Sequence, residues 1–204
     1  LSHRGPDDAD TWVGRVADGF ALRGHRRLFV IVPSVAGRQP MRTADGRGVL
    51  VYNGELYNDL ELRRELGQRG VVFRTHCDTE TLLYALREWG RDALPRLRGM
   101  FAFAYVDVES GTALLARDPL GVKPLYWWRG VICGEPEFVF ASEPAAIVAH
   151  PEIRAEPDMA AVSAYMTTIR TTIGERTLFE GVRVVEPGCC VEVDIAGGGV
   201  MPRG

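Results

Sequence analysis

Residues 52–58 read Tyr-Asn-Gly-Glu-Leu-Tyr-Asn and directly follow the apolar run at residues 49–51. The apolar run predicts a short strand that stops at Asn53-Gly54, because Asn-Gly after a strand is typical of a turn. Asn58, with a glutamate three residues later, resembles a capping box and predicts that a helix follows. The stretch is therefore expected to form a strand, a corner and a helix.

The sequence on both sides of this stretch alternates strand and helix signals. Upstream, a hairpin is expected around Asp18-Gly19. Downstream, Asp78 precedes an amphipathic helix that Gly90 ends. The expected strands are 12–16, 20–31, 71–74, 100–108, 112–117, 138–142, 182–185 and 190–195, the other helices are 143–149 and 160–166, and a loop or linker begins at Gly197.

The composition excludes several classes of protein. The chain has 204 residues, with 24 Lys+Arg against 27 Asp+Glu, so a net charge of −3 predicts no general nucleic-acid binding. No apolar run approaches the roughly 20 residues that span a bilayer, so no membrane association is expected. The four cysteines are Cys77, Cys133, Cys189 and Cys190, with no Cys-x-x-Cys pair. We therefore expect a reduced, cytoplasmic protein without a metal site.

Two other short strings stand out beside residues 52–58. They are His-Arg-Gly-Pro-Asp at residues 3–7 and Cys-Asp-Thr-Glu at residues 77–80. Taken singly, the candidate residues have structural explanations: Asn-Gly forms a turn, Asp78 caps a helix, and Arg27 is a solvated charge on a strand. These explanations lose force only when the strings are considered together.

Together, and followed by Arg-Asp-Pro-Leu-Gly-Val-Lys-Pro-Leu-Tyr at residues 117–126, the strings resemble the glutaminase domain of the asparagine synthetases, a class II glutamine amidotransferase. The resemblance runs from Leu1 through Glu143 and continues more weakly through residues 174–182. It implies an α+β chain with the N-terminal-nucleophile hydrolase fold, a four-layer sandwich of two antiparallel sheets flanked by helices.

The resemblance also implies a pocket that holds a free amino acid at both ends. Arg27 matches the arginine that binds the α-carboxylate of glutamine, a task suited to a planar fork of donors. Asp78 matches the acid that pairs with the α-ammonium group. The residues just after the arginine, Leu28, Val30 and Ile31, match the stretch whose main chain also touches glutamine.

Three residues of the first stretch complete the implied pocket. The side-chain amide of Asn53 and the backbone N–H of Gly54 match the oxyanion hole, which stabilises the negative oxygen of the tetrahedral intermediate. Glu55 follows them and lines the same pocket. The family further uses an N-terminal cysteine as the nucleophile, and the resemblance places it some tens of residues before the Arg-Gly-Pro-Asp string. We therefore expect no residue of this chain, Cys77 included, to be the nucleophile.

The division of the chain follows from the same resemblance. Residues 1–150 are expected to form an amidotransferase type-2 domain without its nucleophile segment, and residues 151–204 its end and a link toward an ATP-dependent synthetase domain. The chain lacks the Ser-Gly-Gly-x-Asp-Ser string of that domain, and Gly197–Gly199 does not replace it. No cofactor is expected in this chain, and ATP and magnesium are expected only in the synthetase domain.

The implied function is release of ammonia from L-glutamine for ATP-dependent amidation of aspartate or a similar carboxylate. The partner would be the synthetase domain of the same polypeptide, and the sequence leaves a homodimer open. An alternative is a non-catalytic scaffold for a synthetase that makes another amide or a ring. A third hypothesis is a domain that only senses glutamine.

Overall fold

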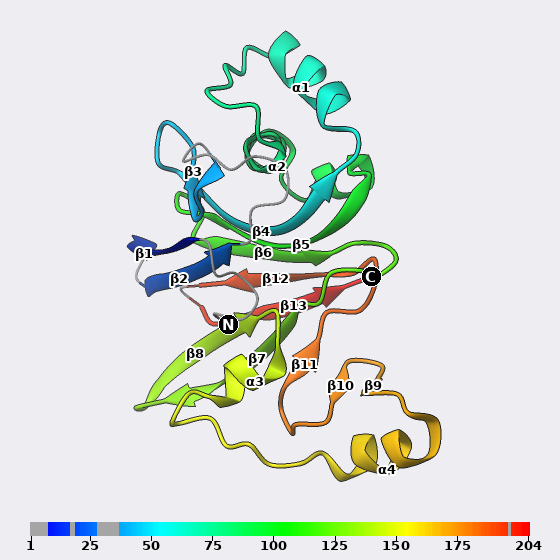
Figure 1. The fold of residues 1–204 in the computed structure, drawn as a ribbon. Coiled ribbons are helices and arrows are strands. Elements are labelled where there is room, and N and C mark those ends of the chain that lie inside the picture. Colours follow the sequence, from blue (N-terminus) through cyan, green and yellow to red (C-terminus); the bar gives the residue numbers. More distant parts are fainter. Residues whose placement is uncertain (1–7, 17–18, 28–36, 196) are drawn as a thin grey trace.

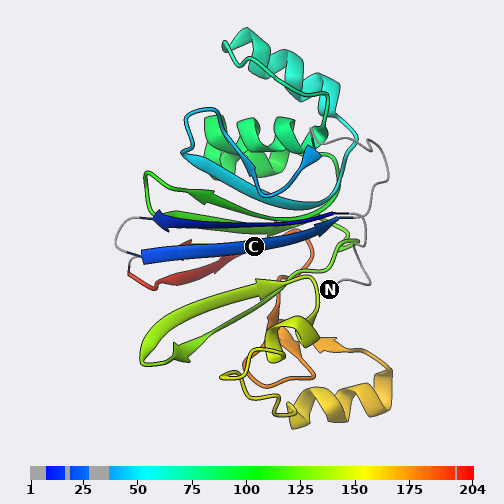
Figure 2. The ribbon, with the colours of Figure 1, turned by 60° about the vertical axis from the view of Figure 1, so that its left-hand side comes forward.

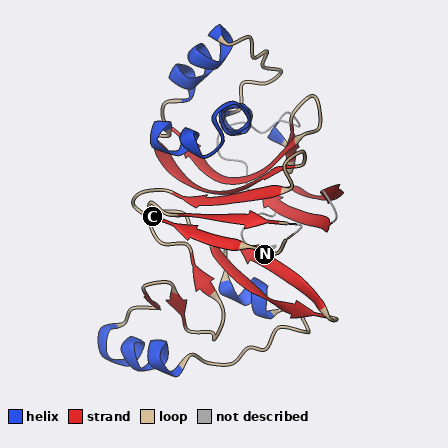
Figure 3. Cartoon of the chain, turned by 180° about the vertical axis from the view of Figure 1, so that it is seen from behind, coloured by secondary structure: helices blue, strands red, loops and turns tan. Residues whose placement is uncertain are grey.

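The computed structural model describes the backbone of residues 8–16 and 19–27 and all of residues 37–195 and 197–204. Two antiparallel sheets lie against each other, and the helices lie on the outer faces of the pair (Figure 1). Seen from behind, the strands form the middle of the molecule and the helices its two ends (Figure 3). This arrangement confirms the expected α+β sandwich with two antiparallel sheets flanked by helices.

The six-stranded sheet carries the residues 52–56. Its order is β13-β12-β6-β5-β4-β3. The strands are β3 (Met41–Arg42), β4 (Gly48–Leu56), β5 (Gly99–Asp107), β6 (Thr112–Arg117), β12 (Cys190–Asp194) and β13 (Val200–Arg203). Helices α1 (Asp59–Gln68) and α2 (Asp78–Trp89) cover its outer face, and the 3₁₀ helix η2 (Gly90–Arg96) follows α2 (Figure 1).

The five-stranded sheet has the order β8-β7-β11-β10-β9. Its strands are β7 (Tyr126–Ile132), β8 (Glu135–Ala141), β9 (Thr172–Ile173), β10 (Arg176–Thr177) and β11 (Arg183–Val184). Helices α3 (Pro144–Val148) and α4 (Met159–Thr168) lie on its side of the molecule, away from α1 and α2 (Figure 2). A separate two-stranded ribbon joins β1 (Asp8–Val16) and β2 (Gly19–Arg27).

Strict alternation of side chains along the strands of the six-stranded sheet builds two apolar layers. Leu50 and Tyr52 of β4 face the helices and join the buried leucines of α1 and α2. Val49 and Val51 face the other sheet, where Trp127 of β7 lies in the same cluster. A third, smaller cluster around Ile147 packs α3 on the five-stranded sheet. The helices and sheets are therefore held together by burial of both faces of the central sheet.

Several predicted elements agree with the structure. The hairpin around Asp18-Gly19 is β1–β2, although residues 28–31 of the expected strand lie outside the described residues. The amphipathic helix from Asp78 is α2, and Gly90 follows it with a positive φ of 55° that suits glycine. The hairpin at residues 100–117 is β5–β6.

Other predictions about secondary structure are wrong. Strand β4 does not stop at Asn53-Gly54 but continues to Leu56, because β5 pairs with it over its full length. Residues 71–74 form no strand. The strand β7 was not expected, and residues 200–203, expected as a loop or linker, form β13 on the edge of the six-stranded sheet.

The strands on either side of residues 186–188 belong to different sheets. β11 pairs with β7 in the five-stranded sheet, and β12 pairs with β6 in the six-stranded sheet. Residues 172–203 therefore add strands to both sheets.

Among the described residues, no helix has the length and apolar character needed to cross a membrane.

Candidate functional site

The candidate site lies where β4 ends. Asn53 is exposed and lies opposite Ala102 of β5, while Gly54 and Glu55 are half-buried. A Cβ atom on Gly54 would lie 2.2 Å from the carbonyl oxygen of Met100, in the neighbouring strand. Only glycine allows this approach, so the Asn-Gly pair serves strand pairing here and not a turn.

Asp78 is tied to the same end of β4. It is the first residue of α2, and its Oδ2 accepts hydrogen bonds from the Tyr52 hydroxyl and from the Leu56 N–H, both at 3.0 Å. Its Oδ1 lies 3.6 Å from the Cys77 thiol. The start of α2 also suits a carboxylate, because the unpaired N–H groups of a helix N-terminus carry partial positive charge. The contacts bring Asp78 beside the segment that holds Asn53, Gly54 and Glu55.

The loop before α2 is fixed by side chains that hydrogen-bond to its backbone. Arg63 of α1 donates to the carbonyl oxygens of Thr75 at 2.8 Å and Cys77 at 2.6 Å. The buried Glu80 accepts the backbone N–H groups of Arg74 at 2.9 Å and Thr75 at 2.7 Å. Glu80, which belongs to the Cys-Asp-Thr-Glu string, therefore holds the loop in place. Asp78 is thus presented by a rigid support.

Two residues that were not expected from the sequence hold β4 at the site. Tyr52 is buried, and its backbone N–H donates to Oε1 of the buried Gln39 at 2.6 Å. Burial, reinforced by the negative charge of Asp78, raises the pKa of the Tyr52 hydroxyl far above its usual range. The hydroxyl therefore stays a hydrogen-bond donor to Asp78 at every physiological pH. An aromatic hydroxyl at a core-facing position of an apolar strand was the available signal, since such a group needs a partner.

The remaining predicted site residues fall at or beyond the limit of the described chain. Arg27 ends β2, where its backbone lies opposite Asp8. Leu28, Val30 and Ile31 lie outside the described residues. The structure thus fixes Asp78 to the two residues that flank Asn53, Gly54 and Glu55 in β4, and the position of the Arg27 guanidinium relative to them stays a prediction.

The string at residues 117–126 builds a loop that ties the sheets together. Asp118 is buried and accepts the backbone N–H groups of Phe101, Leu120, Val122 and Lys123 at 2.9–3.2 Å. Burial alone would raise the pKa of Asp118, but the N–H groups outweigh it and hold that pKa below its usual value. The Arg117 guanidinium donates to three carbonyl oxygens, those of Lys123, Val185 and Gly121. This string therefore supports the fold.

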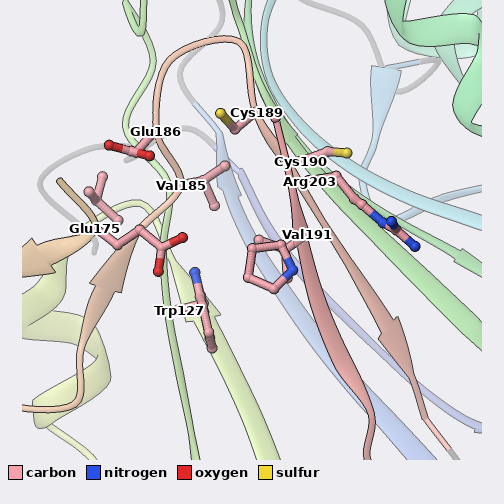
Figure 4. A pocket seen from close by; sticks show the side chains of 11 residues that line it. Trp127, Glu175, Val185, Glu186, Cys189, Cys190, Val191 and Arg203 are labelled. Atoms are coloured by element: carbon pink, nitrogen blue, oxygen red, sulfur yellow. The ribbon is translucent and has the colours of Figure 1, made fainter.

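A small pocket of about 190 Å³ lies near residues 185–191 (Figure 4). Trp127, Glu175 and Glu186 line it, and the side chains of Cys189 and Cys190 point to opposite sides of the chain. None of the predicted site residues that the structure describes lines this pocket. In the part of the chain that the structure describes, no three His, Cys, Asp or Glu side chains gather in a way that could hold a metal ion.

Comparison with protein families and curated proteins gives consistent matches. A family model described as a glutamine amidotransferase domain matches residues 1–201. The glutamine-hydrolyzing asparagine synthetase 3 of Bacillus subtilis (strain 168) is 39% identical over 189 residues, which cover 92% of this chain and 29% of that protein. The glutamine-hydrolyzing asparagine synthetase B of Escherichia coli (strain K12) is 42% identical over 126 residues, 62% of this chain and 22% of that protein. The chain thus spans less than a third of the length of these relatives.

Two solved structures share the fold. The glutamine phosphoribosylpyrophosphate amidotransferase of B. subtilis, in complex with ADP and GMP, matches with a TM-score of 0.62 and 21% identity, covering 100% of this chain and 44% of that one. A structure described as the allosteric regulatory enzyme of purine biosynthesis matches with a TM-score of 0.58 and 23% identity, covering 90% of this chain and 34% of that one. These likenesses confirm the fold expected from the sequence.

Proposed function

The chain belongs to the glutamine amidotransferase domain family, and on that premise we propose that it binds L-glutamine at the end of β4 and takes part in hydrolysis of its side-chain amide. The observation that carries the proposal is the attachment of Asp78 to Tyr52 and Leu56 of β4, the two residues that flank the segment 53–55. A carboxylate at the end of this strand can hold an ammonium group, and the exposed amide and the backbone N–H of the same strand end can stabilise a developing oxyanion.

Each end of glutamine has a group suited to it. Asp78 pairs with the α-ammonium, and Glu55 lies on the same strand segment to strengthen the negative field there. Arg27, with the main chain of Leu28, Val30 and Ile31, would receive the α-carboxylate. The Asn53 amide and the Gly54 N–H would then stabilise the tetrahedral intermediate formed at the side-chain amide.

The nucleophile would be a cysteine at the start of the mature polypeptide, before Leu1, whose thiolate attacks the amide carbon while its own α-amine moves the proton. Three cysteines of this chain suit that role less well. Burial, with nearby acidic groups, raises the pKa of Cys189, and burial raises that of Cys190. Cys77 is buried and lies 3.3 Å from the Thr79 hydroxyl.

The reaction that would use the ammonia is proposed from the names of the curated relatives. Two of them are named as glutamine-hydrolyzing asparagine synthetases, which favours an enzyme over a non-catalytic scaffold. We propose that ammonia from this domain serves ATP-dependent amidation of aspartate or a similar carboxylate by a synthetase domain of the same polypeptide. ATP and magnesium would bind in that domain, and the protein would work in the cytoplasm.

The test is glutamate release from L-glutamine by the polypeptide produced from the start codon upstream of Leu1. We expect turnover, its loss when the N-terminal cysteine is replaced by alanine, and a KM for glutamine raised at least ten-fold by Arg27→Ala or Asp78→Asn. Asp92→Asn, on the exposed surface of η2, is the matched control and should leave KM unchanged. No turnover, or a KM indifferent to both variants, would refute the proposed site.

A further inference from the structure

The carboxylate of Asp78 is held asymmetrically. Oδ2 accepts two strong donors, the Tyr52 hydroxyl and the Leu56 N–H, each at 3.0 Å. Oδ1 faces the Cys77 thiol at 3.6 Å, and a thiol is a weak donor. One oxygen of the pair is therefore used to fix the group to β4, while the other keeps its capacity to accept a hydrogen bond from a cation.

Tyr52 is itself held by the fold through both its ring and its backbone. Its ring is buried in the cluster between β4 and α2, and its backbone N–H is bound to Gln39 at 2.6 Å. Its hydroxyl is thus a fixed donor that reaches from the sheet to the first residue of α2. Leu56 supplies the second fixed donor from the same strand. Two donors at fixed positions determine the orientation of the carboxylate plane, which one donor could not do.

We infer that Tyr52 is a positioning residue of the glutamine site: its hydroxyl fixes Oδ2 of Asp78, so that Oδ1 is directed to the α-ammonium group of glutamine. The inference rests on the proposed function, because it gives Asp78 the ammonium as its ligand. Tyr52 does not touch the substrate in this scheme. Its contribution is confined to the one end of glutamine that carries the ammonium group.

That restriction makes the inference testable with a pair of ligands. L-Glutamine and glutaramate share the side-chain amide and the carboxylate, and they differ because glutaramate has hydrogen in place of the α-ammonium group. The dissociation constants of both are measured by calorimetry on the full chain and on Tyr52→Phe. The ratio of the two constants reports only the ammonium contribution, and it is insensitive to the fraction of protein that is folded.

Tyr52→Phe keeps the buried ring and removes one hydrogen bond to a charged group. We expect it to weaken L-glutamine binding about ten-fold and to leave glutaramate binding unchanged, so the dissociation constant of glutaramate divided by that of L-glutamine falls about ten-fold. The matched control is Tyr105→Phe on the adjacent strand β5. Tyr105 is buried in the same cluster, and its hydroxyl has no hydrogen-bond partner among the described residues, so the ratio should not change.

Asp78→Asn separates failure of the inference from failure of the proposed function. If Asp78→Asn abolishes the preference for L-glutamine while Tyr52→Phe leaves the ratio intact, the inference is wrong and the ammonium site stands. If Tyr52→Phe weakens both ligands equally, the hydroxyl has only a structural role and the inference is also wrong. If L-glutamine does not bind, or binds Asp78→Asn as well as it binds the parent chain, the proposed function itself fails.

Discussion

Asp118 and Asp78 both accept backbone N–H groups beside the six-stranded sheet, yet their surroundings differ in burial and in the number of donors. Asp118 is 1% exposed and takes four N–H groups, two on each oxygen. Asp78 is half-buried and takes two strong donors on one oxygen, while the other oxygen has only the weak Cys77 thiol. A carboxylate whose two oxygens are both used by the backbone stabilises the fold, whereas one that is fixed through a single oxygen can also bind a ligand.

The largest effect on stability is expected from Asp118→Ala. The substitution removes the acceptor of four N–H groups near the buried end of β5, and unfilled hydrogen-bonding capacity of this kind costs about 3–5 kcal/mol. The thermal midpoint should fall by roughly 10 °C for a chain of this size. Calorimetric or fluorescence-detected unfolding measures it. A loss below about 1 kcal/mol would show that Asp118 does not hold the loop.

Gly54→Ala tests the end of β4, where Asp78 is attached, through the close backbone approach of β4 and β5. The new Cβ would lie 2.2 Å from the Met100 carbonyl oxygen and 2.7 Å from the Phe101 Cα, so β4 and β5 must separate. We expect a loss of about 2–3 kcal/mol in the free energy of unfolding. Gly67→Ala in α1 is the matched control, since its Cβ would meet nothing within 4 Å. It should stabilise the chain by about 0.5–1 kcal/mol, and equal signs for the two variants would contradict this assignment.

Acid unfolding tests the hydrogen bonds of Asp118 in a different way. The pKa of Asp118 is lower in the folded chain than in the unfolded one, so its contribution is fully present above about pH 4 and is lost as pH falls through the folded pKa. The stability gap between the parent chain and Asp118→Asn should therefore shrink between pH 5 and pH 3. Urea midpoints at several pH values measure the gap. A gap that stays constant over this range would contradict a lowered pKa.

The sequence predicts regular elements best where their signals are local. The periodic leucines of α2 and the alternating residues of β5 and β6 each specify one face, and these elements form as expected. Asn53-Gly54 misleads, because the local preference of Asn-Gly for a turn is overridden by pairing with β5 at a place where only glycine fits. Residues 182–195 form the two expected strands, but their sheets could not be predicted. Local patterns give two strands, and tertiary packing places them in different sheets.

The residues of the candidate site show the same difference between local signals and contacts across the fold. Asn53, Gly54, Glu55 and Asp78 come from strings that resemble a known family, and the structure attaches Asp78 to the strand that carries the other three. Tyr52 and Gln39 escape sequence reasoning because their roles arise only from contacts across the fold, one to α2 and one from the segment before β3. No spacing rule connects a residue to a partner that is distant in the sequence, as Tyr52 is from Asp78.

The smallest effect on stability is expected from Asp78→Asn, and it sharpens the comparison with Asp118. The amide oxygen of asparagine can still accept from the Tyr52 hydroxyl and the Leu56 N–H, so the link between β4 and α2 survives. We expect a loss below about 1 kcal/mol, arising mainly from the missing negative charge at the helix N-terminus. Urea unfolding measures it beside Asp118→Asn, which should lose more, because the side-chain amide of asparagine cannot accept from the two N–H groups that it would face. If Asp78→Asn proved as destabilising as Asp118→Asn, both carboxylates would be structural, and the end of β4 would lose its distinction as a ligand site.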